Sequence, residues 1–542
     1  MTGDDSRTVV GQFPRTAATR AFGPAVLTRL AWGLWVVSIG VLVARLWAGE
    51  AWSGSPASLS GVFRVDGLTV VMWVVASFFG GIVHSYSVRY LAGSRGIRRF
   101  FTRIFGFTLT VMLLVAADHL LVFLGAWLAM GLVMADLIGF SRSWPQAQAA
   151  ASDARRSFLL GTALLAVAFG ALWSLTGATT VSGVLAAAEN GGLTAAGSGE
   201  LAAAGGGPAA VESLASAAWL IAVLALVVAA AVQSALFPFH SWLLGSMTAP
   251  TPASALMHAG FVNAGGILLV RFASVLTVEP WVLPAVAVVG VVSAVGGKLA
   301  KSVQSDVKRQ LGCSTVGQMG FMILQAGLGF FGAALTHLVL HGFYKAYMFL
   351  SAGGRVEQTA PTTDSTTTNG HESETTAGGH RARSGESPAG VVDWLVTAVA
   401  AVAGGGLFTL LTGKGATLDS GLLLTVLVVV TTLHATRTVV GQQSLSRTLG
   451  YAAVPVVFLP SVAVYAAVYR GVTALLRDLP VVTAPAELTV VHAALVGVFL
   501  LAYVAIESEV YRHSERLYVA LLNATQPPSP TILTDTEEYN EY

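Results

Sequence analysis

The chain has 542 residues, of which 54% are hydrophobic and 11% are charged, and its formal net charge at pH 7 is +2. Because soluble globular proteins carry about 25% charged residues, this composition indicates a polytopic membrane protein with little mass outside the bilayer. The nearly neutral charge argues against nucleic acid as a partner. The single cysteine, Cys313, excludes an internal disulfide and any multi-cysteine metal or cluster site.

Apolar stretches long enough to cross a bilayer, which takes about 20 residues, recur along the chain. They lie at 25–47, 66–88, 99–116, 119–140, 157–177, 214–239, 251–272, 281–300, 306–328, 330–353, 391–411, 419–435, 450–469 and 488–507. Strands are not supported, because these stretches are too long and do not alternate in polarity. The sequence therefore predicts an all-α polytopic membrane protein with about 14 transmembrane helices.

Polar stretches divide the chain into five parts. Residues 1–24 form a polar N-terminal tail without the short apolar core of a secretory signal. Residues 25–355 form the transmembrane core. Residues 356–390 are rich in Thr, Ser and Gly and predict a disordered cytoplasmic loop. Residues 391–507 carry the last transmembrane helices, and 508–542 form a polar C-terminal tail.

The placement of lysine and arginine predicts the orientation. When the predicted spans are passed across the bilayer in one orientation, the basic residues gather in loops on one side, as in 89–103 and 142–156. The long loop 178–213 on the opposite side contains none. Because cytoplasmic loops are enriched in lysine and arginine, we expect a cell-membrane protein with both termini in the cytoplasm.

The first chemically distinctive segment is SALFPFHSWLLGSMTAPTPASALMHAGFVNAGG, residues 234–266. Pro238, Pro250 and Pro252 remove backbone donors and disfavour helix in the residues before them. Such a break is tolerated within a membrane span where it lines a cavity or is buried in protein. His258 follows the break, and it is either part of an ion path or a hydrogen-bonded core histidine beside a re-entrant turn.

The second segment is SDVKRQLGCSTVGQMGF, residues 305–321. Asp306 and Arg309 fit a charged helix entry at the cytoplasmic surface. Lys308 can either extend to that interface or lean into the bundle. Ser314, Thr315 and Gln318 can hydrate an interior path.

The third segment is HLVLHGFYKAYMFL, residues 337–350, in which His337, His341 and Lys345 recur every fourth residue and so share one helical face. A charged residue at the middle of a membrane helix costs about 2.5–3.5 kcal/mol on insertion scales, so such residues usually line an ion path. Imidazole titrates near neutrality, which suits it to passing protons. Two alternatives remain: a structural polar cluster, and a metal site at the HxxxH spacing, although no HExxH glutamate is present and Lys345 would repel the metal.

No P-loop, no dinucleotide fingerprint after a strand, no GxSxG and no paired-carboxylate cluster occurs in the sequence. The chain is therefore expected to be a transporter subunit and not an enzyme, with no cofactor of its own.

These segments resemble the antiporter-like membrane subunits of respiratory complex I, the NuoL family, which includes the large Mrp antiporter subunit. The similar stretches lie at 64–75, 117–140, 234–260, 305–322 and 337–353. The resemblance implies two inverted helix repeats with broken helices and a polar axis along the bilayer midplane. His258, His337, His341 and Lys345 fall on axis positions, Lys308 on a matching lysine, and Lys414 where the second broken helix carries a lysine.

Two positions depart from the family pattern. Leu128 follows Trp127 where the family has glutamate, and Gln233 stands where it has the partner lysine. Losing one partner would leave an uncompensated buried charge, while losing both is electrostatically neutral. Asp136 does not replace the carboxylate, because it lies eight residues on, about 12 Å along the helix.

A shorter branch of the family, the DabB subunits of inorganic-carbon transporters, is more similar. That resemblance implies a DabA-like peripheral partner with a carbonic-anhydrase-like zinc site, and a membrane subunit that passes protons or sodium. The alternatives are a proton-translocating subunit of a complex I, hydrogenase or Mrp-type assembly, and a membrane scaffold that conducts nothing.

Overall fold

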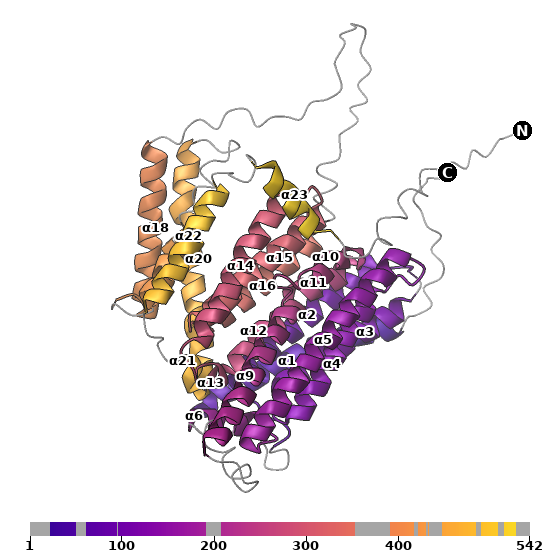
Figure 1. Cartoon of the computed structure of the whole chain (residues 1–542). Helices are drawn as coiled ribbons and strands as arrows, with labels where there is room; N and C mark the ends of the chain where they lie inside the picture. Colours follow the sequence, from indigo (N-terminus) through magenta and orange to yellow (C-terminus); the bar gives the residue numbers. More distant parts are fainter. Residues whose placement is uncertain are drawn as a thin grey trace, which may run out of the picture.

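The computed structural model describes residues 22–49, 52, 61–94, 96–190, 208–352, 391–416, 421–429, 432, 447–483, 489–507 and 514–526. The expected cytoplasmic loop 356–390, most of the N-terminal tail and most of the C-terminal tail lie outside these ranges. The described residues fold almost entirely into helices, many of which run side by side in one bundle (Figure 1).

The front of the chain forms a tightly packed group of helices. Its elements are α1 (Phe22–Ala48), α2 (Gly67–Tyr90), α3 (Ile97–Ala116), α4 (Leu120–Ile138), α5 (Pro145–Thr176), α6 (Val181–Glu189), α9 (Pro208–Gln233), α10 (Ser241–Gly245), η3 (Ser246–Thr248), α11 (Thr251–Ala259), η4 (Phe261–Asn263), α12 (Ala264–Arg271), α13 (Ala273–Leu276), α14 (Val282–Ser302), α15 (Val307–Gly327) and α16 (Phe331–Leu350).

The back of the chain forms a second group of helices beside the first (Figure 1). It contains α18 (Val391–Thr412), a helix over 421–429, α20 (Arg447–Leu475), η5 (Leu476–Asp478), α21 (Pro480–Thr483) and α22 (Val490–Glu507), followed by α23 (Glu515–Ala524). Helix α20 packs against α16, and α22 packs against α14. The two groups are therefore joined through α14 and through α16, the helix that carries His337, His341 and Lys345.

Ten helices of the described part are long and apolar enough to cross a membrane. Large apolar side chains cover their outward faces, for example Leu121, which is 71% exposed, and Leu410, which is 84% exposed. The all-α polytopic prediction is confirmed, but the number of about 14 spans is not. Helices α15 and α16 are as long as several of the ten, and their lysine, histidine and glutamine residues make them less apolar.

The stretch 251–272, expected as one span, consists of two short helices. Helix α11 ends at Ala259, Gly260 leaves the helical conformation, and the short 3₁₀ turn η4 precedes α12. The break frees backbone carbonyls that an unbroken helix would pair. Helix α9 also ends at Gln233, earlier than the expected 214–239, in agreement with the helix-breaking effect of Pro238.

Helices α14 and α15 approach each other closely because both present glycine at their contact. A Cβ atom at Gly297 would overlap the backbone of Gly317, and one at Gly290 would overlap the backbone at Leu324. Small residues permit such contacts between membrane helices. The contact fixes α15 against α14, and α15 provides one wall of the polar site.

A short helix occurs within the expected polar tail. Helix α23 spans Glu515–Ala524, and the residues after it contact the core. His240 donates from Nε2 to the carbonyl oxygen of Ala524 at 2.7 Å, and Gln304 donates to the hydroxyl of Thr525 at 2.9 Å. Thr525 is buried. The C-terminal segment thus lies against the end of the bundle where α10, α11 and α14 meet (Figure 1).

Candidate functional site

Three helices contribute polar side chains to one buried network. The imidazole Nδ1 of His258, on α11, lies 2.9 Å from the hydroxyl oxygen of Thr315, on α15. That hydroxyl also lies 2.9 Å from the carbonyl oxygen of Leu311, and the Lys345 Nζ atom of α16 donates to the same carbonyl at 3.1 Å. His258, Thr315 and Lys345 are each fully buried. The sequence pattern placed these residues on separate helices, and the fold brings them together.

His341 and His337 continue the row along α16, one and two turns from Lys345. Their rings are nearly parallel, with centroids 5.8 Å apart. His341 is buried and His337 is half-buried. The Nε2 atoms of His258 and His337 and both ring nitrogens of His341 have no hydrogen-bond partner among the described residues. Buried polar atoms are normally paired, so these nitrogens are available to water or to a proton.

Lys345 has no carboxylate partner in the described part of the chain. The ion pairs found there join Arg45 to Asp478, Arg103 to Asp136, and Arg271 to Asp66. The amine of Lys345 therefore interacts with a backbone carbonyl and not with a counter-charge. An uncompensated charge is expensive in a membrane interior, which favours a group that exchanges its proton with its neighbours.

Close packing holds α16 against the broken helix. Gly342 leaves no space for a side chain, because a Cβ atom there would meet the Phe79 ring and the carbonyl oxygen of Ala259. On the next turns, the ring of Phe349 stacks on the imidazole of His258, with centroids 4.3 Å apart. These contacts fix the position of His341 and Lys345 along the α16 axis relative to His258.

Lys308 lies nearer the end of the bundle. Its Nζ atom donates to the carbonyl oxygen of Met247 at 3.4 Å, and the side chain is half-buried. Asp306 caps α15 by accepting from the backbone N–H of Arg309 at 2.8 Å. Lys308 thus leans toward η3 and the short helices that follow Pro238, between the bundle end and the buried network.

Gln233 lies at the end of α9 and is buried. Its amide Nε2 donates to the carbonyl oxygen of Phe261 at 3.4 Å, and the neighbouring Ser234 donates to the carbonyl oxygen of Val262 at 2.8 Å. Asn263 donates to the carbonyl oxygen of Ala259 at 2.7 Å. Three side chains therefore donate to carbonyl oxygens at the helix break, and the Phe261 carbonyl also accepts from the backbone N–H of Ala264. A neutral donor at 233 performs this role without a buried charge.

Lys414 lies apart from this network. It occupies the turn after α18 and is half-buried, and its carbonyl oxygen accepts from the hydroxyl of Thr425 at 3.3 Å. No contact of Lys414 with His337, His341 or Lys345 occurs in the described part of the molecule. Its place in the path remains a prediction from the resemblance.

Sequence reasoning missed an ion pair at the opposite end of the bundle. Arg271, the last residue of α12, binds both carboxylate oxygens of Asp66, the N-cap of α2, and donates to the carbonyl oxygen of Val115 at 2.8 Å. Both side chains are buried. The sequence shows each charge at the end of an apolar span, Arg271 after one and Asp66 before another, but it does not indicate that the two residues pair.

The histidines do not form a metal cluster. Among the described residues, no group of three His, Cys, Asp or Glu side chains converges to hold an ion. The HxxxH spacing instead produces two parallel rings stacked along α16.

Two family models match the chain. The model described as NADH:quinone oxidoreductase/Mrp antiporter, TM, matches residues 116–372. The model described as NADH-Ubiquinone oxidoreductase (complex I), chain 5 N-terminus, matches residues 53–101. The matched ranges include His258, Lys308 and the whole of α16.

Several curated proteins are similar to this chain. The probable inorganic carbon transporter subunit DabB1 of Halothiobacillus neapolitanus is 38% identical over 315 residues, which is 57% of this chain and 52% of that protein. The corresponding DabB of Bacillus subtilis is 39% identical, over 55% of this chain and 54% of that protein. Subunit L of the NADH-quinone oxidoreductase of Mycobacterium tuberculosis is 34% identical, over 54% of this chain and 43% of that protein. The chain thus spans about half the length of the curated relatives it matches.

Solved structures share the fold. A chain of the Mrp complex from Dietzia sp. DQ12-45-1b superposes with a TM-score of 0.56 at 21% identity, over 92% of this chain and 58% of that one. A chain of the archaeal membrane-bound sulfane sulfur reductase superposes with a TM-score of 0.55 at 13% identity, over 93% of this chain and 92% of that one. At these identities the likeness establishes the helical architecture.

Proposed function

Because the chain belongs to the family of antiporter-like membrane subunits shared by NADH:quinone oxidoreductases and Mrp antiporters, we propose that it is the ion-conducting membrane subunit of an inorganic-carbon transporter. Relatives named as inorganic carbon transporter subunits support this reading. So does the loss of the charge pair at Leu128 and Gln233, which distinguishes this chain from the pattern of the complex I subunits.

The observation that carries the proposal is the buried row of Lys345, His341 and His337, joined to His258 through Thr315 and the Leu311 carbonyl. Four of its imidazole nitrogens are unpartnered among the described residues. A row that served structure alone would be expected to satisfy these atoms with protein partners. An incompletely paired row of titratable groups suits stepwise proton transfer through bound water.

We favour protons over sodium as the conducted ion. Hard cations are held by oxygen ligands such as carboxylates and carbonyls. The unpartnered atoms of this row are imidazole nitrogens, which bind and release protons near neutral pH. Sodium remains testable, because a sodium gradient can be imposed without a pH gradient.

The carbon chemistry would belong to a partner. We propose a DabA-like peripheral protein with a zinc site that interconverts CO2 and bicarbonate, and the relatives named as probable inorganic carbon transporter subunits support a partner of this kind. This chain would sit in the cell membrane with its basic loops and both termini in the cytoplasm. Proton flow through it would be coupled to the partner's reaction.

Purification from the native membrane provides the first test. The chain should copurify with a large peripheral zinc protein, and the complex in proteoliposomes should acidify the lumen only when a pH gradient is imposed. Copurification with a set of redox or antiporter subunits would instead assign the chain to a complex I, hydrogenase or Mrp-type assembly. That alternative draws support from the NADH-quinone oxidoreductase subunits among its relatives.

Lys345→Ala and His341→Ala provide the second test. Each should lower proton flux at least tenfold while the partner still copurifies, because the row loses a titratable step but no partner surface. Arg155→Ala, which removes an exposed cation on α5, is the matched control and should conduct normally. Unchanged activity of the whole complex in both row variants would instead support a membrane scaffold that conducts nothing.

A further inference from the structure

A narrow internal cavity lies in the front group of helices. Its volume is about 40 Å³, and α2, α3, α4, α12 and α16 contribute to its walls. The lining extends along α12 from Asn263 to Arg271, a rise of about 12 Å at 1.5 Å per residue. Most of its lining is apolar. The cavity is thus a thin passage running along the broken helix.

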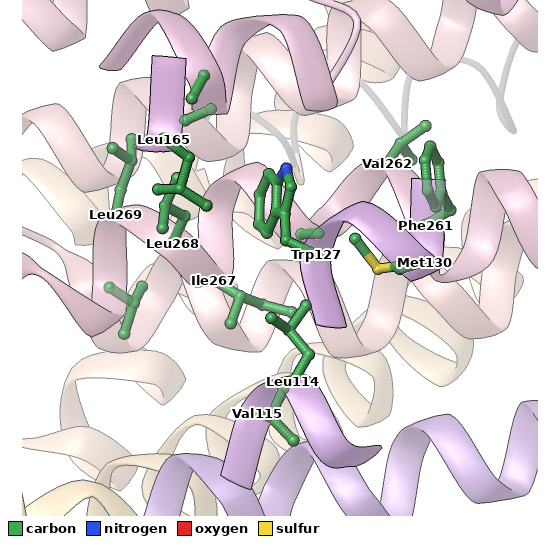
Figure 2. Packing of buried hydrophobic residues seen from close by; sticks show 14 of the residues in the cluster. Leu114, Val115, Trp127, Met130, Leu165, Phe261, Val262, Ile267, Leu268 and Leu269 are labelled. Carbon is green, nitrogen blue, oxygen red and sulfur yellow. The ribbon is translucent and has the colours of Figure 1, made fainter. Parts of the chain in front are cut away.

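Two buried polar groups line this cavity and lack a partner. The indole N–H of Trp127 is an unpaired donor, and the amide oxygen of Asn263 is an unpaired acceptor. Trp127 is 2% exposed and Asn263 is 1% exposed. Figure 2 shows Trp127 packed among apolar side chains that include Ile267, Leu114 and Met130. An unpaired donor and an unpaired acceptor that line one cavity call for a small molecule that can both accept and donate.

Arg271 separates this cavity from a second, more polar pocket. The second pocket has a volume of about 150 Å³, and its walls include Asp66, Asp118, Ser182 and Asp478 as well as Arg271. It lies at the end of the bundle formed by α6, α13 and α21, opposite α23 (Figure 1). Because Arg271 lines both spaces, its ion pair with Asp66 stands between them.

The inner end of the cavity approaches the buried row. Leu338, which follows His337 on α16, lines it, as do Ala259 and Gly260 at the helix break. His258 precedes Ala259 directly. The cavity therefore runs from the Arg271–Asp66 pair toward the helix turns that hold His258 and His337.

We propose that this cavity binds water, held between the Trp127 N–H and the Asn263 amide oxygen, and that it is the inner part of an outward access path closed by the Arg271–Asp66 pair. At about 10–15 Å³ per water, it has room for about three molecules. Water satisfies both orphaned groups at once. This path, lined by the neutral groups of Trp127 and Asn263, would take the role of the charge pair that the family has at positions 128 and 233 and that this chain lacks. This inference rests on the proposed ion conduction, whereas the hydration itself is independent of it.

Thiol labelling tests the closure. In a Cys313→Ser background, Ala264→Cys places a thiol in the cavity and Ala186→Cys places one in the outer pocket. Silver ion added from the outside should label Ala186→Cys rapidly and Ala264→Cys slowly. Neutralising the pair with Asp66→Asn and Arg271→Gln together should speed labelling of Ala264→Cys at least tenfold, with the Ala186→Cys rate unchanged.

A high-resolution electron cryomicroscopy map of the unmodified complex tests for the water directly. This test remains usable if the Asp66→Asn, Arg271→Gln double variant fails to fold. Density is expected between Trp127 and Asn263, and it should weaken in Trp127→Phe, which replaces the indole by a smaller ring without an N–H donor. An empty cavity would overturn the proposal, and so would equal labelling of Ala264→Cys with and without the ion pair. Arg271 would then have a structural role only. Because neither readout is ion flux, absence of conduction in the unmodified complex would count against the proposed function alone.

Discussion

Thr315 links the titratable side chains of two helices through a single hydroxyl. Its oxygen lies 2.9 Å from both the His258 imidazole and the Leu311 carbonyl that Lys345 also contacts. The hydroxyl can accept from one neighbour and donate to another. Without it, His258 and Lys345 would face each other across an apolar gap.

Thr315→Val should therefore slow proton flux about tenfold, a barrier increase of about 1.4 kcal/mol. The shape of the side chain is kept, so expression and partner binding should be normal. Thr315→Ser, which restores the hydroxyl, should recover most of the flux in the same proteoliposome assay. Equal flux in Thr315→Val and the unmodified protein would show that protons pass without this group.

The sequence identified most titratable members of the site because their spacing is local. His337, His341 and Lys345 follow the helical period within one segment, and the structure places them on one face of α16. The ion pair of Arg271 with Asp66 was not identified, since the two residues lie 205 positions apart. Nothing in either segment specifies the other, and tertiary packing alone brings them together.

At the scale of single elements, the broken helix α11–η4–α12 organises the site. Side chains of Gln233, Ser234 and Asn263 occupy the carbonyls freed at the break. Helix α9 therefore fixes the geometry of the break, and the break fixes His258. Loss of the Asn263 amide would remove the donor to the buried Ala259 carbonyl, at a cost of about 1–3 kcal/mol.

Gln233→Lys is expected to be poorly tolerated. The new ammonium would be buried beside the Phe261 carbonyl, with Leu128 where the family has a carboxylate, so its charge would be uncompensated. We expect a lower yield of detergent-stable complex and a lower melting temperature than for Gln233→Met, which keeps the length without the charge. Normal yield and normal flux in Gln233→Lys would show that this region is already well hydrated.

Helix positions followed from the sequence more closely than their ends. Most predicted spans agree with the observed helices within a few residues, because bilayer thickness sets the length of apolar runs. Helix α5 is an exception, since it begins at Pro145 and not near 157. Its first turns, rich in alanine but also polar, extend the helix past the apolar run, and proline is favoured at a first helical position.

At the scale of the whole molecule, the C-terminal segment connects to the core through His240. This residue lies between α9 and α10, outside the spanning helices, and burial lowers the pKa of its imidazole despite hydrogen bonds to backbone carbonyls. In the docked state the ring is therefore neutral at a pH where a free histidine is already charged. We expect detachment of α23 to expose this ring to water. As the pH falls below about 6.5, the undocked state then binds more protons, so docking loses stability.

A fluorophore on Asn523→Cys, in a Cys313→Ser background, should report this change. Its anisotropy should be high at pH 7.5 and should fall toward pH 5.5 as α23 detaches. His240→Gln can still donate to the Ala524 carbonyl but does not titrate, so its anisotropy should be independent of pH. A pH-dependent signal that persists in His240→Gln would assign the change to another group.

The pairing of Asp66 with Arg271 also has a consequence for biosynthesis. Asp66 emerges from the ribosome with α2, and 205 further residues must be translated before its guanidinium partner exists. Until then the carboxylate lacks the guanidinium of Arg271. While α2 and α3 are inserted as a hairpin, the carboxylate is therefore expected either to stay hydrated at the lipid headgroups or to be protonated. Arrival of α12 neutralises the site and locks the starts and ends of three helices together. Completion of the broken helix is thus the step at which this buried carboxylate gains its counter-charge.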